Sequence, residues 1–406
     1  MDTLIKGGLV YTVATAPVRN GAIAINNGKI ESVGPASDFS EGDFGEIINL
    51  PNQVLMPGFV NAHSHLQFSA LRGKIPRGLG FVEWIRRLIP AQFATEEEDV
   101  LRGIRDGISE MLSTGTTAVG DISNDVRFAR LVAASGLNAV CFAEVIAPRA
   151  QEAEKAFNDA SARVAEMRGA GINTGLSPHA PFTVSEKLFG LLKSFAAENS
   201  LPVTIHVAES AEEEEFVRDG SGDLRLLLEE RGYPQTGFGG HAKTPVQLLE
   251  SYGALDGALA VHLNTADDED WEILAKHGAV PVFCPGSSAW FGRKKVLPFD
   301  RLLKAGMRPA VGTDSLASNS SLSMLDELRI AAEYFPSIKR EDMAEAATLN
   351  GALALGLNCG SIEKGKRADI ISFMGGKTGD SLSAVFGAKK PEFVMINGKR
   401  VTGTKL

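Results

Sequence analysis

The chain has 406 residues, 44% of them hydrophobic and 22% charged, so it is long enough for one large domain and a smaller one. Its formal net charge of -9 argues against a nucleic acid or an anionic membrane as partner, because both require a basic surface. No stretch has the unbroken apolar length of a membrane span, and no charged start precedes a long apolar core, so we expect a cytoplasmic protein. A small molecule is the expected ligand.

The cysteines indicate neither a disulfide framework nor a thiolate metal site. Cys141, Cys284 and Cys359 are odd in number, far apart and outside any Cys-x-x-Cys pattern. We expect all three to be reduced.

Both ends of the chain have the texture of short strands broken by turns, including an Asn-Gly pair that is typical of a tight hairpin. We therefore expect residues 1–57 and 358–406 to form one small sheet domain. The strands expected at the two ends cover residues 4–13, 21–28, 29–33, 361–373 and 392–401.

Between the two ends, residues 58–357 alternate helical patterns with short apolar runs that are typical of fully buried strands. Eight such runs separated by helices predict an α/β fold, a (β/α)8 barrel, whose active site lies at the carboxyl ends of its strands. The eight expected strands cover residues 59–65, 116–122, 138–145, 172–179, 202–209, 258–262, 279–284 and 308–314.

The first of these runs ends in two histidines, His63 and His65, separated by one residue. Alternate residues of a strand point to the same side, so both imidazoles would face one centre, as a divalent metal requires. His206 ends the fifth run and Asp314 closes the eighth. Three imidazoles and one carboxylate leave a coordination position for water, as in a catalytic zinc site.

Any one of these residues alone would be interpreted as a hydrogen-bonded core residue. The set of four favours a metal, because burying so many unpaired polar groups at one barrel mouth would cost several kcal/mol. Glu209 follows His206 closely enough to place a second carboxylate beside that centre. The acidic run from Glu212 to Glu215 is interpreted as a solvated helix start.

Seven motifs give the chain an end-to-end resemblance to the amidohydrolase superfamily. It looks most similar to the branch that holds methylthioadenosine/S-adenosylhomocysteine deaminases, guanine deaminase, aminofutalosine deaminases and triazine chlorohydrolases. The motifs are Pro57-Gly-Phe-Val-Asn-Ala-His63-Ser-His65-Leu66, Glu110-Met-Leu-Ser-Thr-Gly-Thr-Thr117, Ser177-Pro-His179-Ala-Pro-Phe-Thr183, His206-Val-Ala-Glu209, Phe283-Cys-Pro-Gly-Ser-Ser288, Gly312-Thr-Asp314-Ser-Leu-Ala-Ser-Asn319 and Gly360-Ser-Ile-Glu-Lys-Gly-Lys-Arg-Ala-Asp369.

The resemblance implies a distorted (β/α)8 barrel with a composite β-sandwich, and a single zinc, or iron, on His63, His65, His206 and Asp314. Binuclear members of the superfamily carry a bridging carboxylated lysine. The end of the fourth strand here offers Ser177-Pro-His179 and no lysine, so one metal is expected.

The same resemblance implies roles for two further residues. The residue that matches Glu209 passes a proton to a ring nitrogen, and the residue that matches His262 helps to activate the water. Relatives often have His-Cys-Val-His-Leu at this strand, and His262 aligns best with the first of those histidines. We expect Glu209, His262 and Asp314 to be the catalytic residues.

Substrate contacts are expected from His179 and Trp84, which match positions that face the ligand in the branch. Each has an alternative, since His179 could be a packed structural residue and Trp84 could face the barrel on a helix. Arginine matches carboxylate in bidentate fashion, so loop arginines, above all Arg72 and Arg149 and also Arg77 and Arg293, are further candidates. His241 precedes an expected helix and could close over the pocket or be a surface residue; Glu83 lies beside Trp84.

The predicted function is zinc-dependent hydrolytic deamination of an aminopurine nucleoside, with release of ammonia. The loop from Ile75 to Ile85, together with residues 206–210 and 313–319, looks more similar to aminofutalosine deaminases than to methylthioadenosine deaminases. This resemblance implies 6-aminodeoxyfutalosine, an intermediate of menaquinone biosynthesis, ahead of S-adenosylhomocysteine, methylthioadenosine or adenosine. The alternatives are a triazine-type chlorohydrolase, a guanine deaminase and a catalytically inactive scaffold of the same fold. The intact ligand set disfavours the scaffold, and relatives frequently form homodimers.

Overall fold

The computed structural model describes residues 1–233, 240, 242–375 and 381–401. Within them, eight parallel strands form the centre of the molecule in two four-stranded sheets. Isolated bridges between Leu176 and Val203 and between Ser64 and Asp314 join the two sheets at both edges, so the eight strands close into a barrel. The strands are β6 (Phe59–Ser64), β7 (Thr116–Ile122), β8 (Asn138–Val145), β9 (Thr174–Pro178), β10 (Thr204–Val207), β11 (Leu259–His262), β12 (Val280–Phe283) and β13 (Ala310–Val311).

The eight apolar runs of the sequence therefore all contain strands, two of them with the expected bounds. The others are shorter than expected, and β13 keeps only two residues of its run. The barrel strands are almost wholly buried because helices cover their outer faces, which explains the lack of alternation in the sequence.

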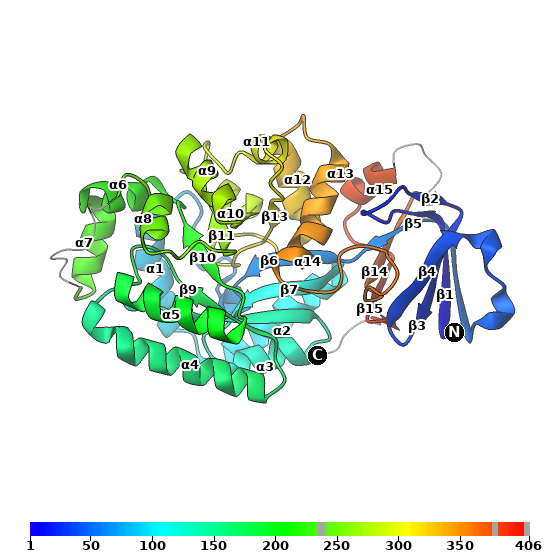
Figure 1. Cartoon of the computed structure of the whole chain (residues 1–406), viewed down its shortest axis with the longest axis horizontal. Coiled ribbons are helices and arrows are strands. Elements are labelled where there is room, and N and C mark those ends of the chain that lie inside the picture. The colour runs from blue at the N-terminus through cyan, green and yellow to red at the C-terminus, as the bar shows by residue number, and fades with distance from the viewer. Residues whose placement is uncertain (234–239, 241, 376–380, 402–406) are drawn as a thin grey trace.

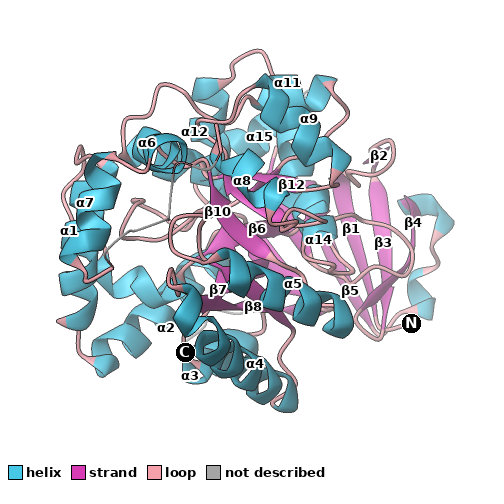
Figure 2. Cartoon of the chain, turned by 60° about the vertical axis from the view of Figure 1, so that its left-hand side comes forward, coloured by secondary structure: helices cyan, strands magenta, loops and turns pink. Residues whose placement is uncertain are grey.

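Helices surround the barrel, and in Figure 2 the magenta strands lie among cyan helices. No helix in the described part of the chain is long and apolar enough to cross a membrane. The helices are α1 (Phe81–Phe93), α2 (Glu97–Ser113), α3 (Val126–Ala134), α4 (Ala153–Gly169), α5 (Glu186–Asn199), α6 (Ala211–Asp219), α7 (Gly222–Glu230), α8 (Pro245–Ser251), α9 (Asp268–Lys276), α10 (Pro285–Trp290), α11 (Phe299–Lys304), α12 (Met324–Tyr334), α13 (Arg340–Glu345), α14 (Gly351–Ala354) and α15 (Ser381–Gly387).

Helix α2 shows why such segments are helical. Its buried residues recur at helical spacing, from Ile104 and Ile108 to Met111 and Leu112, so one face packs on the barrel. Three acidic residues lie in its first turn, where their negative charge interacts favourably with the positive end of the helix dipole. Gly103 lets the helix approach the segment after β6, since a Cβ there would lie 2.6 Å from the backbone nitrogen of Ala70.

The two ends of the chain form one eight-stranded sheet, as expected from their strand texture. Strand β14 pairs antiparallel with β5, so the C-terminal strands continue the N-terminal sheet. Figure 1 shows these blue and red strands side by side at the right of the barrel. The strands are β1 (Thr3–Val10), β2 (Val18–Arg19), β3 (Gly21–Asn26), β4 (Lys29–Pro35), β5 (Glu46–Pro57), β14 (Ile370–Met374), β15 (Phe393–Ile396) and β16 (Lys399–Arg400).

Two turns in this sheet test the sequence interpretation. The hairpin between β3 and β4 turns at Asn27 and Gly28, which have φ of 50° and 72°, as the Asn-Gly signal predicts. The break expected at Gly365-Lys366 is confirmed, but the strand expected before it is wrong, because β14 begins only at Ile370. A turn closed by the Lys366 N–H and the Glu363 carbonyl, with Gly365 at φ 85°, occupies that stretch instead.

Candidate active site

His63 and His65 meet at the end of β6. Both side chains are buried, and their ring centroids lie 4.9 Å apart. The carbonyl of His63 accepts the backbone N–H groups of Thr313 and Asp314, so the end of β6 is joined to the end of β13. Asp121, at the end of β7, accepts the Leu66 N–H at 2.8 Å and fixes the turn that carries His65.

His206 and Asp314 complete the cluster. His206 Nε2 lies 3.2 Å from His65 Nε2, and one ring nitrogen from each of His63, His65 and His206 lies within 4.8 Å of the other two. Asp314 Oδ1 lies 3.9 Å from His63 Nε2 and 3.8 Å from His65 Nε2. The structure thus brings together all four residues that the sequence proposes as metal ligands.

The protonation of His63 and His65 and the hydrogen bond of His206 suit metal binding. His206 Nδ1 donates to the carbonyl of His179 at 2.9 Å, which leaves the lone pair of Nε2 facing the cluster. Burial holds the pKa of His63 well below its ordinary value and lowers the pKa of His65 to about 3. Both imidazoles are therefore neutral at pH 7, and neutral imidazole is the form that binds a metal.

Unpaired polar atoms provide the test of fit. Both ring nitrogens of His63 and Nδ1 of His65 are buried without a hydrogen-bond partner among the described residues. Leaving such atoms unpaired costs about 1–3 kcal/mol each. A cation held by nitrogen lone pairs removes part of that cost, and a set of three imidazoles and one carboxylate suits a divalent metal.

Hydroxyl groups orient the carboxylate of Asp314. Its Oδ2 accepts hydrogen bonds from Ser287 Oγ at 2.8 Å and from Ser318 Oγ at 2.9 Å, which leaves Oδ1 facing the histidines. The backbone of Asp314 has φ of 58°, in the left-handed region that non-glycine residues rarely adopt. Such a constraint is common where a side chain must be aimed at a site.

Glu209 and His262 lie beside the cluster. Glu209 Oε2 is 3.7 Å from His262 Nε2, and Oε1 accepts a hydrogen bond from Arg293 Nη2 at 3.0 Å. Burial raises the pKa of Glu209 to about 8, although Arg293 opposes the shift. Burial also lowers the pKa of His262 to about 3, so its imidazole is neutral.

Residues 212–215 do lie at the start of a helix, α6, as expected, but Glu213 contradicts the interpretation that they are solvated. Its side chain is fully buried, and its two carboxylate oxygens accept the N–H of Ala208 at 3.2 Å and of Glu209 at 2.7 Å. This turn needs support because Ala208 has φ of 52°. The Ser210-x-x-Glu213 spacing, typical of a helix start whose glutamate turns back, could have revealed the residue.

The cluster opens into a cavity of about 380 Å³ whose outer wall is mainly apolar. His179, Glu209, His262 and Asp314 line it, and Trp84 forms part of the wall. The Trp84 indole N–H donates to the carbonyl of Ala317 at 2.9 Å, so α1 is tied to the loop that follows Asp314. Further wall residues are Phe68, Phe81, Ile85, Leu88, Ile89, Ile146, Phe182, Leu227, Leu228 and Tyr233.

The arginine candidates lie elsewhere, with one exception. Arg72 pairs with Glu110, and Arg149 pairs with Glu152 at 3.2 Å; neither is among the residues that line the cavity. Arg149 stacks on Tyr233, which does line it, at 5.0 Å. Arg293 reaches the site directly through its hydrogen bond to Glu209.

Two smaller candidates complete the set. Arg77 lies over the ring of Trp290, 5.0 Å from its centroid. His241 falls outside the described residues.

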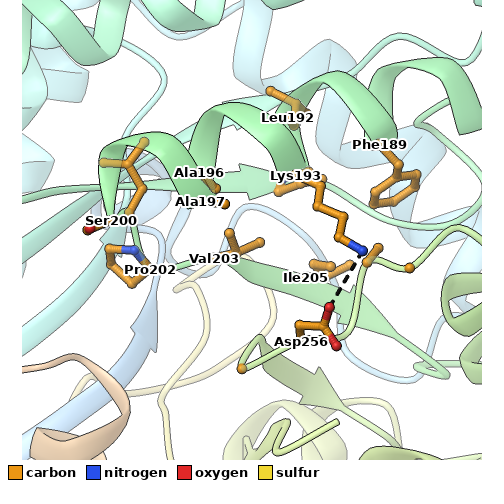
Figure 3. A pocket seen from close by; sticks show the side chains of 15 residues that line it. Phe189, Leu192, Lys193, Ala196, Ala197, Ser200, Pro202, Val203, Ile205 and Asp256 are labelled. Atoms are coloured by element: carbon orange, nitrogen blue, oxygen red, sulfur yellow. Dashed lines mark ion pairs between the residues drawn. The ribbon is translucent and has the colours of Figure 1, made fainter.

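A second cavity, of about 280 Å³, lies between α5 and β10 (Figure 3). Its wall is apolar apart from Ser200 and the pair formed by Lys193 and Asp256, whose Nζ and Oδ2 atoms are 3.5 Å apart. None of the proposed metal ligands lines it. The chemistry therefore belongs to the first cavity.

Comparison with known proteins agrees with the barrel and its cluster. The profile of the amidohydrolase family matches residues 54–401, and the chain belongs to that family. A 5-methylthioadenosine/S-adenosylhomocysteine deaminase of Desulforamulus reducens is 31% identical over 389 residues, which cover 91% of this chain and 84% of the relative.

Among solved structures, aminofutalosine deaminase of Helicobacter pylori in complex with methylthio-coformycin superposes with a TM-score of 0.89 at 26% identity, over 98% of this chain and all of that one. An adenosine deaminase of Xanthomonas campestris with bound zinc gives a TM-score of 0.83 at 27% identity, over 98% of this chain and 92% of that one. Atrazine chlorohydrolase of Arthrobacter aurescens is 19% identical with a TM-score of 0.82, over 98% of this chain and 94% of that one, a likeness of fold alone.

Proposed function

We propose that the protein is a metal-dependent hydrolytic deaminase that acts on an aminopurine nucleoside and releases ammonia. The observation that carries the proposal is the position of Glu209, a buried carboxyl group beside a cluster of three histidines and an aspartate. The deaminase names of the relatives from Desulforamulus reducens and Helicobacter pylori support the same reaction.

The proposed metal ligands are His63, His65, His206 and Asp314, and zinc is the proposed ion, with iron as the alternative. The bound zinc of the Xanthomonas campestris adenosine deaminase supports zinc. When bound, the ion would supply a water nucleophile at neutral pH, because it lowers the pKa of a coordinated water to about 7.

Glu209 is the proposed proton donor. Attack of water on the amino-bearing carbon of a purine builds negative charge on the adjacent ring nitrogen, which must be protonated as the charge grows. With its pKa raised to about 8, Glu209 is mostly protonated at pH 7 and has a proton to give. His262, whose Nε2 lies 3.7 Å from Glu209 Oε2, is proposed to help activate the water and to stabilise the tetrahedral adduct. Asp314 acts as a ligand and orients the attacking water.

The proposed substrate is 6-aminodeoxyfutalosine, with S-adenosylhomocysteine, methylthioadenosine and adenosine as further candidates. The likeness to aminofutalosine deaminase along the whole chain supports this order. His179 and Trp84, both at the cavity wall, are proposed to contact the nucleoside. Arg149 and Arg72 are proposed to reach a substrate carboxylate from outside the cavity, Arg149 from its position against Tyr233, which lines the cavity.

We also propose that the barrel, residues 58–357, is the catalytic domain. Residues 1–57 and 358–406 would form the accompanying sandwich, which the shared terminal sheet supports.

Ammonia release tests the function. The zinc-loaded protein is offered 6-aminodeoxyfutalosine, S-adenosylhomocysteine, methylthioadenosine, adenosine, guanine and a chlorotriazine at equal concentration. Release from at least one purine nucleoside is expected, with 6-aminodeoxyfutalosine giving the highest kcat/KM. The proposal would be overturned if the protein, at full metal occupancy, left every nucleoside unchanged but released ammonia from guanine or chloride from the triazine.

A further inference from the structure

We propose that Glu144 and Asn124 form a substrate-recognition subsite that accepts hydrogen bonds from the nucleoside beside the reacting centre. The inference rests on the proposed function, because it names how that cavity reads its ligand. Neither residue belongs to the metal cluster or to the proton-transfer group described above.

Both residues lie at strand ends that open into the cavity. Glu144 is near the end of β8, Asn124 follows β7, and both line the cavity with His65, His179 and His206. One carboxylate oxygen of Glu144 lies within 4.8 Å of a ring nitrogen of His179 and of His206. The carbonyl of Glu144 accepts Arg163 Nη1 at 2.9 Å, which anchors the strand from outside.

The two side chains leave one acceptor each without a partner. Asn124 Nδ2 donates to Glu144 Oε2 at 3.0 Å, so the pair is fixed side by side. Glu144 Oε1 and Asn124 Oδ1 are both buried and have no hydrogen-bond partner among the described residues. Glu144 is only 8% exposed, so bulk water does not satisfy its free oxygen. A buried carboxylate oxygen next to an empty volume calls for a hydrogen-bond donor.

A second metal does not explain these acceptors. His206 offers only Nε2, because its Nδ1 donates to the carbonyl of His179, and Nε2 lies 3.2 Å from His65 Nε2 in the first cluster. His179 Nδ1 pairs with Thr183 Oγ1 at 2.8 Å, which leaves its Nε2 as a single ring nitrogen beside Glu144. One carboxylate and one free imidazole make a polar recognition edge and no complete metal site.

The subsite selects for donors. A nucleoside carries N–H groups on its ring amine and O–H groups on its sugar, and either kind satisfies two adjacent acceptors. A ligand that presents an acceptor to Glu144 and Asn124 leaves their free oxygens unpaired and repels them. A polar site rejects an analogue in this way. The shared requirement is therefore a pair of N–H or O–H hydrogens at this edge.

The test is a variant–ligand cycle by titration calorimetry in the zinc-loaded Glu209→Gln background, so that the nucleosides are not hydrolysed during the titration. Glu144→Gln turns a donor toward the cavity, because the amide oxygen stays on Asn124 Nδ2. Asn124→Ala removes the second acceptor together with the donor that holds Glu144 Oε2. Glu166→Gln, an exposed residue of α4, is the matched control. The ligands are adenosine, 2′-deoxyadenosine, 3′-deoxyadenosine and 6-chloropurine riboside.

Glu144→Gln is expected to weaken adenosine binding by about 10- to 100-fold, the range for hydrogen bonds to charged groups, with zinc content unchanged. For a ligand that lacks the N–H or O–H group bound by Glu144, the same substitution should change the affinity by less than about threefold. A reduced loss with the deoxynucleosides assigns the subsite to the sugar, and with the chloropurine to the ring amine.

Three results would overturn the inference. Equal losses with all four ligands, or no loss, would leave Glu144 a structural residue, and loss of zinc from Glu144→Gln would make it a metal ligand. If no nucleoside is deaminated but the affinities still show the expected dependence on variant and ligand, the proposed function is wrong and the subsite is confirmed.

Discussion

The buried carboxyl groups at the barrel mouth differ in their hydrogen-bond partners, and the partners determine whether each group can bind a metal, support a turn or transfer a proton. Asp314 receives two serine hydroxyls on one oxygen and presents the other to the histidines. Glu213 receives two backbone N–H groups and positions the turn that carries Glu209. Glu209 itself has one oxygen on Arg293 and the other near His262, which leaves it able to exchange a proton.

The raised pKa of Glu209 gives the reaction a pH dependence. A proton donor must be protonated, and burial places the pKa of this carboxyl at about 8. We expect kcat/KM to fall as the pH rises through about 8, approaching about tenfold for each further pH unit. Steady-state rates between pH 6 and 10 measure this, and a kcat/KM that is constant or rises over that range would contradict the role of Glu209 as the acid.

Loss of the Glu213 carboxylate should disturb Glu209 without removing it. Glu213→Ala leaves two buried N–H groups unpaired, at about 1–3 kcal/mol each, and frees the turn at Ala208. We expect kcat to fall roughly tenfold or more through misplacement of Glu209, with metal content unchanged. Chemical unfolding and kinetics measure the two effects. Glu214→Ala, which removes only a pair with Arg218, is the control, and equal behaviour of both variants would refute the positioning role.

The hydroxyls that hold Asp314 should set the metal affinity. Removing a group that orients a ligand typically costs about 10- to 100-fold in affinity, and we expect this of both Ser287→Ala and Ser318→Ala. Zinc competition with a chelator provides the measurement. Ser288→Ala changes the neighbouring hydroxyl, which contacts Asn264, and should leave the affinity unaltered. A loss as large in Ser288→Ala would indicate general damage to α10 instead.

At the scale of elements, the sequence could predict the repeated strands and the residues at their ends, but not the contacts that depend on loop conformation. The barrel strands follow from buried apolar runs, and His63, His65, His206 and Asp314 follow from their places at strand ends. The buried role of Glu213 and the paired state of Arg72 depend on loop conformations that no periodicity encodes. The same holds for Arg293, whose contact with Glu209 joins residues 84 positions apart.

Helix α1 connects the cavity wall to the loop after β13 through Trp84, and a variant at this residue tests the connection. Trp84→Phe keeps an aromatic ring at the wall but removes the hydrogen bond to the Ala317 carbonyl. Since such a bond contributes about 0.5–1.5 kcal/mol, we expect KM to rise about two- to tenfold with a smaller change in kcat. Steady-state kinetics on the preferred nucleoside measure both constants. A fall in kcat with KM unchanged would instead place Trp84 in the chemistry.

At the scale of the whole molecule, the four proposed metal ligands come from the ends of strands in both halves of the barrel. His63 and His65 come from β6 and the loop after it, His206 from β10, and Asp314 from the loop after β13. The barrel is closed at Ser64 and Asp314 by a single isolated bridge, close to the ligands. A bound ion would therefore support closure as well as chemistry.

Metal removal should accordingly lower stability. An ion present at about 100 times its Kd stabilises the folded state by about 2.7 kcal/mol, so chelation should lower Tm. Differential scanning calorimetry with and without chelator measures the shift, and readdition of zinc should reverse it. His63→Ala should show little response to chelator, because one ligand is already missing. A full response in that variant would place the bound ion elsewhere.

The most direct test of the account is ammonia release by Glu209→Gln beside the wild type, at matched zinc content, on the best nucleoside substrate. Glutamine keeps the shape of the side chain but carries no transferable carboxyl proton. We expect kcat to fall by roughly 10²- to 10⁴-fold while zinc stays bound. A variant that retains its zinc and the wild-type rate would show that Glu209 does not deliver the proton, and the proposed mechanism would be wrong.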